Sequence, residues 1–165
     1  MKKLYTLLAL TIGFSMNAQW NYNSTSTGIQ SSTNNASGAR AIAMGGYTTA
    51  SGDYTTAMGR YTTASGNRAT AMGGNTTASG IYSTAMGYDT TASGDSSTAM
   101  GYDTTAFGDS STAMGRGTTA SGTDSTAMGY YTQASGSRST AMGRSTTASD
   151  YASTVIGQYN SSGST

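Results

Sequence analysis

A three-residue motif, Ala-x-Gly, recurs every seven residues along most of this chain, and no insertion or deletion interrupts the spacing. The first motif begins at Ala36 and the sixteenth at Ala141. The middle residue alternates between Met and, in most cases, Ser, so the full repeating unit has fourteen residues. Self-similarity at a fixed period is typical of proteins built from stacked structural repeats. We therefore expect one elongated domain made of fourteen-residue coils.

Three other repetitive or low-complexity classes do not fit these residues. In a coiled coil, Gly in every heptad costs about 1 kcal/mol per site relative to Ala, and the seam would contain Ala and Gly instead of Leu and Ile. Collagen needs Gly at every third residue together with Pro, and the chain has no Pro. A disordered Gly- and Ser-rich linker has no reason to keep a register.

Short strands joined by tight turns do fit the repeat. Each heptad divides into five strand residues and two turn residues, as in Ser83–Gly87 before Tyr88–Asp89, and Thr90–Gly94 before Asp95–Ser96. Strand side chains alternate between faces, so Ala and Gly share the inner face and Met or Ser lies outside. We predict an all-β fold, a parallel β-roll or β-solenoid of 14-residue coils with two short strands per coil.

The charged residues support this division. From Arg40 to Arg144 all of them fall in a predicted turn pair: Arg40, Asp53, Arg60, Arg68, Asp89, Asp95, Asp103, Asp109, Arg116, Asp124, Arg138 and Arg144.

The predicted interior is thin, because only Ala, Gly, Ser and Thr face inward. We expect positive φ angles at the corners, where Gly87 and Gly94 lie. The inward hydroxyls, such as those of Ser83, Thr90 and Ser97, need hydrogen-bond partners, and backbone groups of the turns can supply them.

One outer face carries Met in every coil. An apolar strip of this length exceeds what a soluble monomer usually exposes, and burying one Met contributes roughly 1.5–3 kcal/mol. We expect other copies of the chain to cover it; the alternative is that Met is buried between the sheets of a single chain. The predicted interface comprises Met44, Met58, Met72, Met86, Met100, Met114, Met128 and Met142, with Ile42 and Ile156 near its ends.

Heptads such as Ser-Thr-Ala-Met-Gly and Thr-Thr-Ala-Ser-Gly resemble the head repeats of trimeric autotransporter adhesins, the YadA-like head domain. The resemblance covers about Ser32 to Gly157. It implies a left-handed parallel β-roll, a homotrimer packed through its hydrophobic sheets, and adhesion to host or abiotic surfaces. Thr and Met stand here where the family pattern has Val and Ile, which makes the implied interface wetter and more pliable.

The turns between the two halves of each coil collect aromatic and basic residues. Tyr and Arg are typical contact residues, so this edge is the candidate adhesive surface, although the same ladder could serve stability instead. It comprises Tyr47, Tyr61, Tyr88, Tyr102, Tyr130, Arg60, Arg116 and Arg144.

Stacked aspartates are a second feature of the turns. Asp89 and Asp103 lie one period apart, as do Asp95 and Asp109. A bridging Ca²⁺ would relieve their repulsion, but solvated turn residues are the favoured interpretation, and we predict no metal site.

The outer face without Met suggests an alternative function. Its hydroxyls would form a flat, regular lattice similar to the Thr-x-Thr faces of β-solenoid ice-binding proteins, although Phe107 and Gln133 interrupt it. The alternative ice-binding face comprises Thr49, Ser51, Thr63, Ser65, Thr77, Ser79, Thr91, Ser93, Thr119 and Ser121.

The two ends of the chain lack the repeat. Residues 1–19 have the basic start and short apolar run of a secretory signal peptide, and residues 20–31 form a polar segment. The roll spans 32–157, and 158–165 are a polar tail. The short N-terminal apolar run and the Met-Lys-Lys start suggest a bacterial exported protein. No stalk or membrane anchor follows, so we do not expect self-anchoring.

The composition disfavours catalysis. The chain has no His, Cys or Glu, and it lacks nucleophile-elbow and phosphate-loop patterns. The near-neutral net charge of +1 does not suggest a nucleic-acid partner. We expect a secreted, non-enzymatic, cell-surface adhesin-type head without a cofactor. An ice-binding solenoid and a passive spacer are the alternatives.

Overall fold

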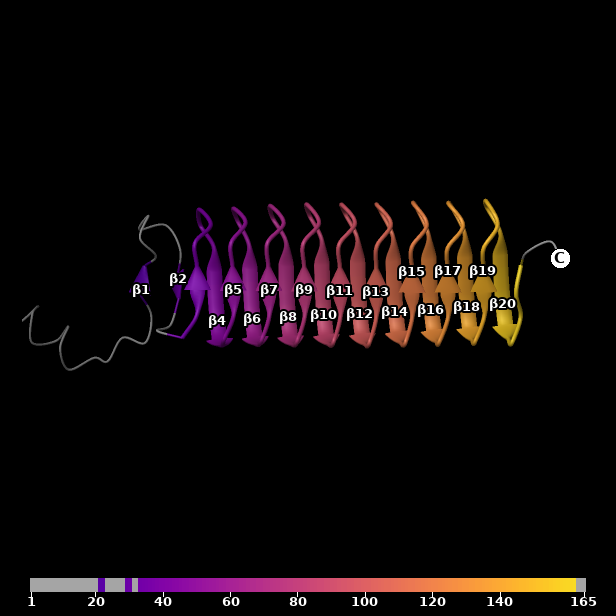
Figure 1. The fold of residues 1–165 in the computed structure, drawn as a ribbon, viewed down its shortest axis with the longest axis horizontal. Coiled ribbons are helices and arrows are strands. Elements are labelled where there is room, and N and C mark those ends of the chain that lie inside the picture. The colour runs from indigo at the N-terminus through magenta and orange to yellow at the C-terminus, as the bar shows by residue number, and fades with distance from the viewer. Residues whose placement is uncertain (1–20, 23–28, 31–32, 163–165) are drawn as a thin grey trace, which may run out of the picture.

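The computed structural model of the 165-residue chain describes residues 21–22, 29–30 and 33–162 (Figure 1). The predicted signal peptide at residues 1–19 lies outside the described residues, as do residues 163–165 of the predicted tail. All regular structure in the described part is β-strand, and the coils follow one another in a straight stack from β3 to β20.

The larger sheet, here called the Met sheet, has eleven strands, and its central strands carry the Ala-Met-Gly motifs. Its strands are β1 (Asn21–Tyr22), β2 (Ile29–Gln30), β4 (Ile42–Gly46), β6 (Thr56–Arg60), β8 (Thr70–Gly74), β10 (Thr84–Tyr88), β12 (Thr98–Tyr102), β14 (Thr112–Arg116), β16 (Thr126–Tyr130), β18 (Thr140–Arg144) and β20 (Thr154–Gln158). The pair β1–β2 is antiparallel, and all other neighbours are parallel.

The second sheet, here called the Ser sheet, has nine parallel strands of two residues each. These are β3 (Asn35–Ala36), β5 (Thr49–Ala50), β7 (Thr63–Ala64), β9 (Thr77–Ala78), β11 (Thr91–Ala92), β13 (Thr105–Ala106), β15 (Thr119–Ala120), β17 (Gln133–Ala134) and β19 (Thr147–Ala148).

The register between coils follows the sequence period. Thr84 pairs with Thr98, and Met86 pairs with Met100. Each residue type therefore stacks on its own kind along the molecule. The predicted all-β parallel solenoid of fourteen-residue coils is confirmed.

The interior is made almost entirely of small side chains. The buried apolar core consists of Ala, apart from Val155 in the last coil. Ser and Thr two residues before these alanines are also buried, as with Ser83 and Thr90. None of the eight methionines in the described coils enters the core, so these methionines are not packed between the two sheets of one chain.

The division into equal five-residue strands is wrong. The Met-sheet strand runs over Thr84–Tyr88, one residue later than predicted, and the Ser-sheet strand over Thr91–Ala92 only. The ladder ends early because the amides of Ser93 and Gly94 both donate to the Ala106 carbonyl, at 2.9 and 3.3 Å. Two residues of one coil thus oppose one residue of the next, and the chain bends away from the strand direction.

The corner prediction holds for Gly87 and is wrong for Gly94. Gly87 has a φ of +126°, whereas Gly94 is not in the left-handed region. Gly94 is required by close packing instead, because a Cβ there would lie 2.1 Å from the Gly108 carbonyl oxygen.

The inward hydroxyls are only partly paired. Ser83 Oγ donates to the Gly80 carbonyl at 2.7 Å, as predicted. Within the described residues, Thr90 Oγ1 and Ser97 Oγ have no hydrogen-bond partner, contrary to the prediction.

The turns form two edges of the stack. We name each edge by the order of the strands that its turns connect. The long-to-short edge leads from a long strand of the Met sheet to a short strand of the Ser sheet, as at Tyr88 and Asp89. The short-to-long edge leads back to the Met sheet, as at Asp95 and Ser96. The second residue of a turn has a positive φ, such as +55° at Asp89 and +57° at Ser96. Its amide donates to the preceding coil, from Asp89 to the Gly74 carbonyl at 2.9 Å. The turns are therefore as regularly stacked as the strands.

The last coil continues past β20. The Thr147 amide donates to the Asn160 carbonyl at 2.9 Å, and the Ser162 amide donates to the Thr147 carbonyl at 2.8 Å. Residues 159–162 therefore cover the C-terminal end of the Ser sheet.

Candidate functional surfaces

The predicted interface methionines form one straight ladder on the outer face of the Met sheet. They stand in register from Met44 to Met142, and Ile156 continues the ladder at its C-terminal end. A parallel ladder of partly exposed Thr, including Thr84, runs beside them on the same face. We call these two ladders together the Met face.

Neighbouring coils already cover most of each methionine. The eight Met side chains are only partly exposed, while Ile156 at the open end is 62% exposed. Ile42 lies on the same face but in the Thr ladder, since it pairs with Thr56. The Met face is thus a narrow apolar strip of even width.

The long-to-short edge holds the residues predicted to be adhesive, and it joins five of them in a single stack. The rings of Tyr88 and Tyr102 are stacked with their centroids 5.5 Å apart. The Arg116 guanidinium lies over the rings of Tyr102 and Tyr130, at 5.4 and 5.6 Å. Arg144 lies over Tyr130 at 5.7 Å. We call these five residues the Tyr–Arg stack.

The other three predicted residues form a separate cluster nearer the N-terminus. Tyr47 and Tyr61 are stacked with their centroids 5.1 Å apart, and the Arg60 guanidinium lies 4.9 Å from the centre of the Tyr61 ring. The coil with Gly74 and Asn75 has no ring at this edge, and it separates the cluster from the Tyr–Arg stack.

Two further tyrosines on this edge were not predicted. Tyr131 packs edge-on against Tyr130, with centroids 4.5 Å apart. Tyr159 contacts Arg144, whose guanidinium lies 5.6 Å from the ring centre. Both tyrosines occupy the second position of a turn, where the residue has a positive φ. The direction of their side chains depends on this backbone angle.

The short-to-long edge carries a second set of Tyr and Arg that sequence reasoning missed. Arg68 lies over the rings of Tyr54 and Tyr82, at 5.4 and 5.2 Å, and its Nη1 donates to the Tyr82 hydroxyl at 2.8 Å. Arg40 likewise donates to the Tyr54 hydroxyl. The signal was present in the sequence, because these residues are spaced fourteen apart like those of the other edge.

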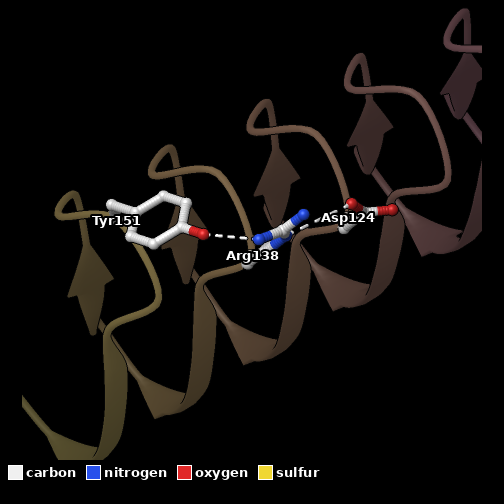
Figure 2. Close-up of polar contacts among 3 residues, drawn as sticks. All are labelled: Asp124, Arg138 and Tyr151. Atoms are coloured by element: carbon white, nitrogen blue, oxygen red, sulfur yellow. Dashed lines mark hydrogen bonds and ion pairs between the residues drawn. The ribbon is translucent and has the colours of Figure 1, made fainter.

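Figure 2 shows the same pattern nearer the C-terminus. Asp124, Arg138 and Tyr151 come from successive turns. Arg138 Nη1 donates to the Tyr151 hydroxyl, and Arg138 Nε lies 3.9 Å from Asp124 Oδ2. On this edge, therefore, the guanidinium groups are paired within the chain.

The turn aspartates have structural partners. Asp109 Oδ1 accepts the Asp95 amide at 2.9 Å, and Asp95 Oδ1 accepts the Ile81 amide at 2.8 Å. On the other edge, Asp89 Oδ1 accepts from Asn75 Nδ2 at 2.8 Å. Within the described residues no group of three His, Cys, Asp or Glu side chains could hold a metal ion. Asp89, Asp95 and Asp109 thus fasten one turn to the next, whereas the Asp103 carboxylate has no hydrogen-bond partner among the described residues.

The outer face of the Ser sheet presents the predicted hydroxyl ladders. Thr91 is partly exposed and pairs in register with Thr77 and Thr105. Phe107, which is 56% exposed, interrupts the Ser ladder, and exposed Gln133 interrupts the Thr ladder. The longest uninterrupted stretch of both ladders therefore runs from Thr49 to Ser93.

The described part of the chain has no helix with the length and hydropathy needed to cross a bilayer.

Comparison with protein families gives one match. Residues 36–62, 64–90, 92–118, 106–132, 120–145 and 134–160 each match the model of the YadA head domain repeat, which contains two copies of the repeat. These matches span nearly all of the coils. No curated protein matches the chain.

Proposed function

Because the chain belongs to the family of YadA head domain repeats, we propose that it is the head of an exported bacterial surface adhesin. In this proposal three copies pack their Met faces about a common axis. The two turn edges and the Ser sheet then remain outside, where they meet host or abiotic surfaces. The proposed role is attachment and not catalysis, and it requires no cofactor.

The Met face carries this proposal. It is an unbroken strip of eight methionines on the outside of a chain whose own core is almost entirely Ala. Full burial of eight methionines would contribute about 12–24 kcal/mol, but neighbouring coils already cover most of each side chain. The remaining gain is at most a third of that, or no more than about 4–8 kcal/mol per subunit. This is comparable with the whole stability of a typical domain.

The exposed turns support an adhesive role. Tyr and Arg dominate contact surfaces because they bury a large area and also form hydrogen bonds. Tyr47 is 63% exposed, and Tyr88 is 55% exposed. Such side chains recur from coil to coil, so a partner with its own repeat meets several equivalent contacts, and three copies multiply them.

Retention of the purified chain on surfaces tests the adhesive role. We expect matrix proteins, glycans, cells or plastic to hold it above a scrambled sequence of the same composition. Replacing Tyr88, Tyr102 and Tyr130 by Ala should reduce the retained amount severalfold. The matched control replaces Tyr54, Tyr82 and Tyr151 on the opposite edge. If the wild-type chain is retained on none of these surfaces, the adhesive role is wrong, and ice binding or a passive spacer role remains.

The hydroxyl ladders of the Ser sheet favour ice binding as a second candidate. From Thr49 to Ser93 they form a regular lattice with a coil spacing of about 4.8 Å. Thermal hysteresis decides between the candidates. An ice-binding protein would shape ice crystals and lower the freezing point, and Thr77→Leu would abolish both effects. Absence of any effect at high protein concentration would remove this candidate.

A further inference from the structure

Arg116 and Arg144 on the long-to-short edge have no acceptor for their N–H groups in the described part of the chain. Their guanidinium groups lie over the rings of Tyr102, Tyr130 and Tyr159. Both arginines are exposed, and neither forms an ion pair with another described residue. The rings thus hold two cations in place while leaving their hydrogen-bond donors unused.

The short-to-long edge provides an internal comparison. There Arg68 donates to the Tyr82 hydroxyl, and Arg138 donates to Tyr151 and lies beside Asp124. The same two residue types, stacked at the same period, are therefore paired within the chain on one edge and unpaired on the other. Stacking of an arginine on tyrosine rings is therefore compatible with hydrogen bonding of its guanidinium group. It does not explain why the N–H groups of Arg116 and Arg144 have no acceptor.

The spacing of the two free cations fits an extended polymer. Arg116 pairs in register with Tyr130, and Tyr130 pairs with Arg144. The two arginines are thus two coils apart, or about 9.6 Å at the usual strand spacing. This is comparable with the length of a disaccharide unit in an extended polysaccharide. A guanidinium binds a carboxylate or a sulfate through two parallel hydrogen bonds.

We propose that the C-terminal half of the long-to-short edge binds a linear acidic polysaccharide that carries about one anionic group per disaccharide. The anionic groups pair with Arg116 and Arg144, and sugar hydroxyls meet the exposed tyrosines beside them. This inference rests on the proposed adhesive function and names its ligand class. In the proposed trimer three such edges engage the polymer together, so that weak single contacts add up to firm attachment.

The charge of the chain favours a sparsely charged polymer over a nucleic acid. The net charge is only +1, and Asp89 and Asp103 lie on the same edge, in the coils before Arg116. A nucleic acid carries a phosphate on every nucleotide, and it would need a broad basic surface. Two isolated cations flanked by rings suit an acidic group on alternate sugars.

Binding of the full purified chain to immobilised polymers tests the proposal. The probes are hyaluronan, with one carboxylate per disaccharide, κ-carrageenan, with one sulfate per disaccharide, neutral dextran and single-stranded DNA. The variant Arg116→Gln/Arg144→Gln is compared with Arg68→Gln/Arg138→Gln, which removes the same charge from the opposite edge. We expect hyaluronan or κ-carrageenan to bind the wild type, the first variant to bind about tenfold more weakly, and the control to change less than about twofold.

A second measurement uses the wild-type chain only, so it does not depend on the folding of a variant. Phenylglyoxal modifies accessible guanidinium groups, and mass spectrometry locates the modified residues. The acidic polymer that binds should slow modification of Arg116 and Arg144 at least severalfold and leave Arg68 unchanged.

Four results would overturn the inference. The first is that both double variants bind the polymer equally weakly, and the second is that the polymer protects all arginines equally from phenylglyoxal. The third is that DNA binds more tightly than either acidic polysaccharide, and the fourth is that no acidic polymer binds. In the last case, a chain still retained on other surfaces loses only this ligand assignment. A chain retained on no surface loses the adhesive function as well.

Discussion

At the scale of single residues, the fold depends on positions where no side chain is tolerated. The Gly of each Ala-Met-Gly motif has a φ near +125° and lies directly beneath the same Gly of the next coil. A Cβ on Gly101 would lie 1.9 Å from the Gly115 carbonyl oxygen. Any larger residue there must separate two coils that are joined by backbone hydrogen bonds.

We therefore expect Gly101→Ala to destabilise the chain strongly. It combines an unfavourable backbone conformation with a backbone clash, and together these cost at least about 2 kcal/mol. Gly46→Ala is the matched control, because Gly46 ends a Met-sheet strand and nothing lies within 4 Å of a Cβ there. Urea unfolding should show a large loss for the first variant and almost none for the second. Equal midpoints would contradict the packing described here.

The turn aspartates allow a second test at this scale. Asp109 accepts the Asp95 amide of the preceding coil, so Asp109→Ala should lower the free energy of unfolding by about 1 kcal/mol and speed hydrogen exchange of that amide. Asp109→Asn keeps an oxygen acceptor and should retain most of the stability. If Asn is as harmful as Ala, charge and not the hydrogen bond explains this aspartate.

At the scale of the coil, the sequence period predicts most of the fold. It predicts the two parallel sheets, the fourteen-residue register, Ala inside, Met outside and charges in the turns. These follow from strand alternation and from stacking of identical residues, which are properties of the backbone. Identical neighbours above and below leave few alternatives for a strand such as Thr84–Tyr88.

The features that the sequence did not predict depend on local geometry. The short Ser-sheet strand ends where two amides share the Ala106 carbonyl, and alternation alone cannot place such a bulge. The Arg68–Tyr82 contact was missed because the direction of a turn side chain depends on the backbone torsion angles. The different roles of Gly87 and Gly94 have the same origin, since both occupy equivalent places in the heptad.

Deleting a whole coil tests this modular account. Removal of residues 83–96 joins Tyr82 to Ser97. Each remaining coil still makes the same kinds of contact with its neighbours, as expected for a repeat array. We expect cooperative unfolding and an unchanged oligomeric state. Removal of 83–89 alone should transfer every later methionine to the opposite side and break the Met face in two. Circular dichroism will follow the unfolding of both deletion variants, and sedimentation will give their oligomeric states. An unchanged oligomeric state after the half-coil deletion would contradict the fourteen-residue register.

At the scale of the whole molecule, the two outer faces differ in the polarity of the side chains that they present. The Ser sheet presents hydroxyl groups that water can solvate, whereas the Met face presents an apolar strip along the coils. The Ala core buries little surface per residue, so in the proposed trimer self-association would add an important share of the stability. The turn edges would then be left outside to meet the proposed ligand.

The mass of the purified chain in solution, measured by light scattering, tests this claim most directly. We expect three times the subunit mass for the wild type and dissociation or unfolding for Met86→Asp/Met100→Asp/Met114→Asp. The control, Ser79→Asp/Ser93→Asp/Ser121→Asp, places the same charges on the opposite face and should keep the wild-type mass. A wild-type chain that is fully folded as a single subunit, with its Met face in water, would contradict the account.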